Sequence, residues 1–440
     1  MSYVIAFVLL VLGAVAAFFR KSLFFGRSLG ISMQNRRNRG VRRRGRMDEE
    51  EILQGVGWQH NVMISGSSPG RAVLLRQLAS RLNREGVPVV ILHRGNRDLE
   101  NMISALNLPG TVICNATARL YDPLKDHDPD DVPEMLLDNE TAARKGLNAA
   151  AKEYIRAIAQ LYCYGGNSTL SIRSLEYSTD VGGNPPRGFT ALIQRVDELV
   201  YQKQTLDPGR AQGIVSLLKT HQQENTNVHQ YALALLKQFD SCMPQKNDER
   251  LPDRQYVNIY RNALKKGILC LDLSSVTDAE SAFSAVISEF RDSNLGTNYV
   301  ILDDIEIGKS PALTNWLASG KFTWCVSCES VQDILPRGNA GPDAGAAFLH
   351  SLADSCQLHV LFRQPPGAAE LWSKYYNEYR KKQVTMQIAK DRGMAVTDGS
   401  DSIIRPDELS TGMGDANVFV FSSLGGKSEF RQGWLRPEEF

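Results

Sequence analysis

The sequence lacks the cysteine pattern of a secreted or zinc-binding protein. Its seven cysteines are an odd number and stand singly, apart from Cys325 and Cys328 in FTWCVSCES. No second pair of ligands follows this C-x-x-C, and dispersed cysteines are typical of reduced thiols in a cytoplasmic compartment. We therefore predict that Cys325 and Cys328 lie on a buried strand and bind no metal.

Acidic residues are absent from residues 20–46, which hold ten arginines and lysines. Subtracting these ten from the net charge of +1 leaves −9 for the rest of the chain. The body is thus mildly acidic, and any affinity for polyanions must come from this segment or from local patches. Three interpretations of the arginine-rich stretch 36–46 are open: a disordered stop-transfer linker on anionic lipid, a nucleic-acid contact, or a solvated linker.

Long apolar runs are also scarce. Residues 3–19 carry no charge, and with their flanks they are just long enough to cross a hydrocarbon core of about 30 Å. Positive charge follows this run instead of preceding it, which argues against a cleaved signal peptide. By the positive-inside rule the N-terminus is outside and the bulk of the chain cytoplasmic. The sequence predicts one transmembrane helix and contact with membrane lipids.

Strand and helix patterns alternate from about residue 47 onward. Continuous Val/Ile/Leu runs of the kind seen in VPVVILH are typical of buried parallel strands with helical crossovers. Residues 129–250 instead show helical spacing with few strand signals, and NVFVFSS is the last predicted strand. We predict an α/β fold with an all-α insertion. The expected divisions are an anchor and basic linker (1–46), a nucleotide-binding domain in two parts (47–128 and 251–425), an all-α domain (129–250) and a tail (426–440).

SGSSPGRA, residues 65–72, lies between the strand NVMIS and a helix, where a phosphate-binding loop would lie. Such a loop surrounds phosphates with backbone N–H groups, while a lysine reaches the β- and γ-phosphates and a Ser or Thr hydroxyl holds magnesium. Gly66 and Gly70 supply flexibility, but Pro69 removes one N–H, Arg71 stands where the lysine should be, and Ala72 cannot bind magnesium. An ordinary turn between strand and helix accounts for the same residues.

A second motif, NYVILDDIE, is an apolar strand that ends in Asp303 and Asp304. In ATPases the first acid of such a pair supports magnesium and the second orients the attacking water. Paired acids after a strand are also typical of a helix cap or a solvated loop. In a parallel sheet both motifs would lie at the carboxyl ends of strands, where ligands bind.

The order of these segments resembles the type IV secretion coupling proteins, which are membrane-anchored relatives of FtsK-type DNA motors. SGSSPGRA resembles their phosphate loop, VVILHRGN a strand that ends there in Asp-Pro-Lys-Gly, and ARLYDPLKD their Asn/Asp-Pro-Leu segment. YVILDDIE and IIRPDELSTGMGDANVFVF resemble their Asp-Glu strand and C-terminal strand, so the resemblance covers most of residues 47–425. It implies a RecA-like P-loop NTPase, a hexameric ring at the bacterial inner membrane, and ATP with Mg²⁺ as cofactors.

The resemblance also implies the site residues. Nucleotide would be bound by Ser65, Gly66, Ser67, Ser68, Gly70, Arg71 and Ala72, and catalysis would use Asp303, Asp304, Lys321 and Glu329, with Asp303 as the magnesium ligand. The family has Lys, Ser/Thr, Glu, Arg and Gln where this chain has Arg71, Ala72, Asp304, Lys321 and Glu329. The arginine that Lys321 replaces would be an arginine finger, which alone contributes a factor of about 10³–10⁵ to the rate of hydrolysis. These departures together predict lost or very slow hydrolysis.

The expected function is therefore recruitment of DNA or protein substrate and its adaptors to a type IV secretion channel, with impaired ATP hydrolysis. Two alternatives are open. One is an active motor in which Arg71 replaces lysine, and the other is a membrane-tethered scaffold that uses the fold only for protein contacts. The basic helical faces at Arg261, Lys265 and Lys266 and at 380–382 suit DNA contact, although solvated helix faces look the same.

Overall fold

The computed structural model describes residues 42–435 with gaps, of which the longest are 176–188, 237–256 and 378–402. The predicted membrane anchor 3–19, Lys321 and the basic face 380–382 all lie outside the described residues. Among the residues that are described, no helix has the length and apolar character needed to cross a bilayer. The anchor remains a prediction.

A ten-stranded sheet forms the centre of the fold, in the order β1-β10-β9-β8-β2-β7-β6-β3-β5-β4. β9 runs antiparallel to β8 and β10, and the remaining strand pairs are parallel. The predicted α/β class with a mostly parallel sheet is confirmed. The strands are β1 (Arg42–Arg46), β2 (Val62–Ser65), β3 (Val89–His93), β4 (Val112–Cys114), β5 (Ile268–Asp272), β6 (Tyr299–Asp303), β7 (Thr323–Cys328), β8 (Leu358–Leu361), β9 (Asn417–Ser422) and β10 (Glu429–Trp434).

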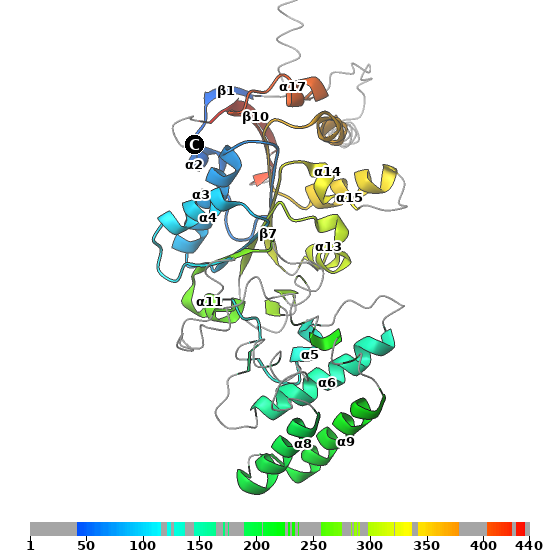
Figure 1. Cartoon of the computed structure of the whole chain (residues 1–440). Coiled ribbons are helices and arrows are strands. Elements are labelled where there is room, and N and C mark those ends of the chain that lie inside the picture. Colours follow the sequence, from blue (N-terminus) through cyan, green and yellow to red (C-terminus); the bar gives the residue numbers. More distant parts are fainter. Residues whose placement is uncertain are drawn as a thin grey trace, which may run out of the picture.

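Helices cover both faces of the sheet (Figure 1). One face carries α2 (Glu49–Ile52), α3 (Gly70–Arg84) and α4 (Arg97–Ala105), and the other carries α13 (Pro311–Ala318), α14 (Val331–Ile334) and α15 (Pro342–Asp354). Alternate residues of each buried strand face the two layers: in β6, Tyr299 and Ile301 belong to the core under α3 and α4, whereas Val300 and Leu302 belong to the opposite core. Both faces are therefore dry, as the continuous apolar runs predicted.

A second group of helices lies beyond one end of the sheet (Figure 1). It comprises α5 (Val132–Leu136), α6 (Lys145–Cys163), α8 (Phe189–Asp197) with the π-helical turn η2 (Glu198–Gln202), and α9 (Pro208–Glu224). The strands that precede this stretch, β1–β4, and those that follow it, β5–β10, join in the same sheet. Two further short helices, α11 (Ile259–Lys265) and α17 (Pro406–Ser410), lie within the second half of the α/β part.

Two strands occur where the sequence predicted none. Arg42–Arg46, which belong to the arginine-rich stretch with three open interpretations, form the edge strand β1, which pairs with β10 in parallel. Glu429–Trp434, expected to belong to a tail after the last strand, form β10 and pair with β9. Neither segment shows an apolar run or a regular alternation, so the sheet that they extend determines their conformation.

Cys325 and Cys328 both lie on β7, as predicted, and both are buried. They face opposite layers of the core, and all six described cysteines are free thiols. Burial raises the pKa of Cys328 to about 12, so this thiol stays protonated. The C-x-x-C is a packing feature of a central strand.

His359 on β8 is buried in an aromatic cluster with Trp372, Tyr376 and Phe421. Its Nε2 donates a hydrogen bond to the carbonyl oxygen of Ala353 at 2.9 Å. Its Nδ1 accepts a hydrogen bond from the Tyr376 hydroxyl at 3.0 Å. Burial lowers its pKa to about 4. The ring is therefore neutral in the folded protein at pH 7.

His359 should make stability depend on pH. Between pH 6.5 and 4 the unfolded chain binds a proton at His359 that the folded chain does not, so the free energy of unfolding should fall by about 3 kcal/mol as the pH is lowered through this window. His359→Gln should remove this dependence while lowering stability at pH 7. Urea unfolding of both proteins at several pH values tests this, and parallel pH profiles for the two would contradict it.

Candidate functional site

The predicted site residues meet at the carboxyl ends of neighbouring strands. The loop 65–72 links β2 to α3, Asp303 ends β6 and is followed by Asp304, and Glu329 follows β7. Because β2, β7 and β6 are adjacent and parallel, their ends lie at one edge of the sheet. The structure thus brings the two motifs together, as predicted, with the exception of Lys321, which is outside the described residues.

Arg71 points from the first turn of α3 onto the two acids. Its Nη2 lies 3.2 Å from Asp303 Oδ1 and also donates to Asp304 Oδ2. The Arg71 side chain is 9% exposed, that of Asp303 is fully buried, and that of Asp304 is 35% exposed. Burial alone would lower the pKa of Arg71, but the charges of Asp303 and Asp304 outweigh burial and raise it. The guanidinium is a permanent charge between two carboxylates.

Each of the four carboxylate oxygens of Asp303 and Asp304 accepts a hydrogen bond from the chain itself. Arg71 bonds one oxygen of each acid, the Asn96 side-chain amide donates to Asp303 Oδ2 at 2.6 Å, and the Glu329 backbone N–H donates to Asp304 Oδ1 at 2.8 Å. The predicted metal ligand, Asp303, is thus fully engaged by protein groups. A buried carboxylate whose two oxygens are both bonded, as in Asp303, needs no further cation.

Asp304 has a left-handed backbone, with φ of +54°. Its N–H donates to the carbonyl oxygen of Ser327 on β7 at 2.8 Å, which fixes the turn after β6. Asp is one of the few residues other than glycine that adopts this conformation, because its short side chain bonds locally. The local geometry therefore explains why a shorter acid stands where the coupling-protein resemblance would place Glu.

The N–H groups of the loop are paired within the protein. The pairs are Gly66 N to Cys328 O at 3.0 Å, Ser67 N to Arg363 O at 2.9 Å, Gly70 N to Ser68 Oγ at 3.1 Å, and Arg71 N to Ser68 O at 3.1 Å. Pro69 has no N–H to offer. A phosphate loop needs several such donors aimed at the ligand, and in this conformation these four are engaged by the protein.

Gly66 and Gly70 have packing roles of their own. Gly66 has φ of +118°, and a Cβ there would lie 2.8 Å from the carbonyl oxygen of Arg363. A Cβ on Gly70 would lie 2.9 Å from both Phe362 Cε1 and Leu435 Cδ1. The glycines that suggested a phosphate loop are required by the close approach of the loop to the chain after β8.

Sequence reasoning missed Asn96 and His93, which follow and end β3. Asn96 holds Asp303 and also caps α4, its Oδ1 accepting from the Leu99 N–H at 3.0 Å. His93 is buried, its Nδ1 accepts from the Asn96 N–H at 3.2 Å, and burial lowers its pKa. The polar letters HRGN after an apolar strand were a signal, because β3 ends at the same sheet edge as β6.

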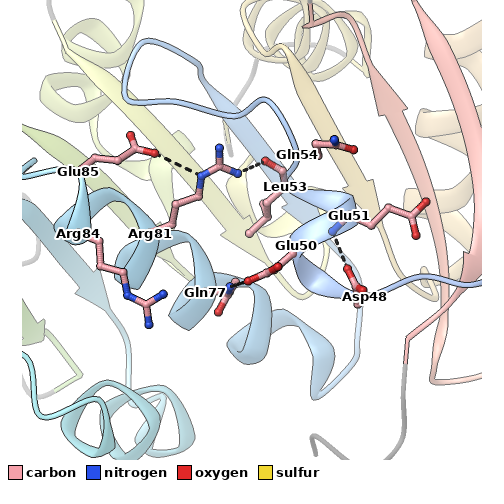
Figure 2. A pocket seen from close by; sticks show the side chains of 9 residues that line it. All are labelled: Asp48, Glu50, Glu51, Leu53, Gln54, Gln77, Arg81, Arg84 and Glu85. Atoms are coloured by element: carbon pink, nitrogen blue, oxygen red, sulfur yellow. Dashed lines mark hydrogen bonds and ion pairs between the residues drawn. The ribbon is translucent and has the colours of Figure 1, made fainter.

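A hollow of about 480 Å³ opens over the loop, and the residues that line it are Ser67, Ser68, Pro69, Arg71, Ala72, Asn96, Asp98, Met102 and Glu329. A larger one, of about 630 Å³, lies away from this edge between α2 and the second half of α3 (Figure 2). In that larger hollow, Arg81 contacts Glu85 at 3.4 Å and the Leu53 carbonyl oxygen at 2.8 Å, so its polar groups mainly satisfy one another. Of these two hollows, the one over the loop adjoins the two motifs.

Magnesium and a nucleotide do not fit this arrangement. The place beside Asp303 and Asp304 is taken by a guanidinium, the loop donors are paired internally, and Ala72 packs in the apolar core under α3 with no hydroxyl to offer. No cluster of three or more His, Cys, Asp or Glu side chains suited to a metal occurs in the described part of the chain. The predicted residues are assembled, but in this arrangement Arg71 lies where a magnesium ion would be held by Asp303.

The fold and its loop define an α/β protein with a mostly parallel sheet and a phosphate-loop-like turn. No protein-family model and no curated protein matches the chain. Solved structures do: the bacterial conjugative coupling protein TrwB in an unbound form (14% identity, 89% of this chain and 88% of that chain, TM-score 0.48) and in complex with ADP and Mg²⁺ (14%, 89% and 89%, 0.48). VirB4 of Thermoanaerobacter pseudethanolicus also matches (14%, 86% and 90%, 0.44). The chain is similar to these solved structures at low sequence identity, and the roles of its residues follow from its own geometry.

Gly66→Ala should destabilise the protein. The left-handed backbone and the contact with the Arg363 carbonyl oxygen should together lower the free energy of unfolding by about 1–3 kcal/mol. Gly213→Ala is the matched control, since a Cβ there meets nothing within 4 Å on the exposed side of α9 and should be neutral or stabilising by up to about 1 kcal/mol. Urea unfolding measures both, and equal effects would show that the loop does not need glycine.

Proposed function

We propose that this protein is a membrane-anchored, coupling-protein-like component of a type IV secretion or conjugation machine, which recruits substrate to the channel and does not hydrolyse ATP. Its core is a RecA-like domain with an all-α insertion. The chain acts as a docking component. The observation that carries the proposal is the Arg71 guanidinium between Asp303 and Asp304.

The ion pairs of Arg71 engage the two acids that ATP hydrolysis would need. Hydrolysis by this fold needs a metal on the first acid and a second acid free to orient water. Here Asp303 is bonded by Arg71 and Asn96, and Asp304 by Arg71 and the Glu329 N–H. Neither acid can serve in that role without breaking a buried ion pair, which is a costly change.

The remaining parts of the proposal are supported by sequence. The order of motifs over residues 47–425 supports the secretion family, and the apolar run 3–19 followed by basic residues supports anchoring in the inner membrane with the body in the cytoplasm. A body charge of −9 suits protein substrates or basic adaptors at least as well as DNA. The resemblance supports a ring of copies.

ATP turnover tests the proposal directly. The full-length protein, assayed for phosphate release with ATP and Mg²⁺, should show no activity above that of its Asp303→Asn variant. Arg71→Lys/Ala72→Thr should also stay at background, because the Gly66 and Ser67 N–H groups remain bonded to carbonyl oxygens. Magnesium-dependent release that Asp303→Asn abolishes would establish a motor and refute the proposal.

A substrate-transfer assay tests whether the secretion machine needs this chain as a docking component. In a host strain deleted for this chain, the wild type and the folded Asp303→Asn variant should restore substrate transfer equally, and a chain lacking residues 3–19 should leave the membrane fraction and restore none. Transfer that never depended on the chain would show that it has no part in the machine.

A further inference from the structure

Arg71 joins the end of β6 to the first turn of α3. In this protein a single nitrogen, Arg71 Nη2, contacts carboxylate oxygens of both acids. Asp303 is fully buried, and an unpaired buried carboxylate is strongly unfavourable. The guanidinium therefore stabilises the folded arrangement of this sheet edge without help from a ligand.

We propose that Arg71 is the permanent cation of this site and replaces a divalent metal ion, so that the site is closed in every nucleotide and metal condition. The inference rests on the proposed function and adds to it a cause: the chain's own side chain closes the site. Such a protein keeps one conformation at this edge of the sheet, whether or not a nucleotide is present.

The residues around Arg71 show which oxygen atoms would lose a partner if the guanidinium were removed. Loss of the guanidinium would free Asp303 Oδ1 and Asp304 Oδ2, while Asn96 and the Glu329 N–H keep the other two oxygens. Ser327 is the partner of Asp303 across the strands, is fully buried, and its hydroxyl has no hydrogen-bond partner among the described residues. Carboxylate and hydroxyl oxygens are ligands that hard divalent cations accept. A variant without Arg71 should thus acquire a cation site that the wild type lacks.

Thermal unfolding of the full-length protein is the first measurement. The melting temperature of the wild type should not change with Mg²⁺, Mg²⁺ plus ADP, or EDTA, while Arg71→Ala should lower it by roughly 3–5 °C, because it leaves the buried carboxylate of Asp303 without its cation. Arg71→Lys should lie between the two. Arg84→Ala, at an exposed position of the same helix, is the control and should change little.

The second measurement is Mn²⁺ binding, which is monitored through the electron paramagnetic resonance signal of the free ion. The wild type should bind no Mn²⁺ at this site, Arg71→Ala should bind it and regain part of its lost melting temperature, and Arg71→Ala/Asp303→Asn should do neither. If Arg71→Ala does not fold, Arg71→Met/Asp303→Asn/Asp304→Asn removes the cation and both charges together and should fold with a melting temperature insensitive to Mn²⁺.

The outcomes separate this inference from the proposed function. A rise in the melting temperature of the wild type with Mg²⁺ or Mg²⁺ plus ADP, without turnover, would overturn the permanent cation and leave a non-hydrolysing docking protein. An Arg71→Ala variant as stable as the wild type would overturn it as well. Turnover by the wild type would overturn both.

Discussion

The buried contact of Arg71 with Asp303 and Asp304 is the interaction on which the rest of the site depends. It joins α3 to the end of β6, and through Asn96 and Glu329 it also fixes the residues that follow β3 and β7. Breaking a buried ion pair by removing one partner costs about 3–5 kcal/mol, far more than an exposed pair contributes. Four segments distant in sequence thus share one electrostatic centre.

The unusual residues of the site agree with one another once that centre is recognised. Ala72 packs against apolar neighbours where a magnesium-binding hydroxyl would have no ion to hold, and Asp304 adopts a backbone that a longer acid would tolerate poorly. Gly66 lets the loop approach the chain after β8, where the Arg363 carbonyl oxygen accepts a hydrogen bond from the Ser67 N–H. Each departure from a working phosphate loop is consistent with a site that Arg71 closes.

Much of this architecture could be predicted from sequence, and the limits have physical causes. Buried strands such as β3 and β6 are continuous apolar runs, so their type and the meeting of the two motifs at one sheet edge followed from pattern alone. β1 and β10 carry no such pattern and exist because a sheet edge offers partners. The state of the loop could not be predicted, because its N–H groups bond to Cys328 and Arg363, which lie far along the chain.

The choice of arginine over lysine at this position follows from the burial of the site. Asp272, His93, Asp303 and Ser327 form one row across four adjacent strands, and burial lowers the pKa of His93, so the imidazole is neutral and gives the row no positive charge. The positive charge must then come from Arg71. Burial readily lowers the pKa of a lysine, whereas a guanidinium stays charged under the same conditions. An arginine therefore holds two carboxylates in a water-poor site at any physiological pH, which a lysine in the same place would do less reliably without a metal ion beside it.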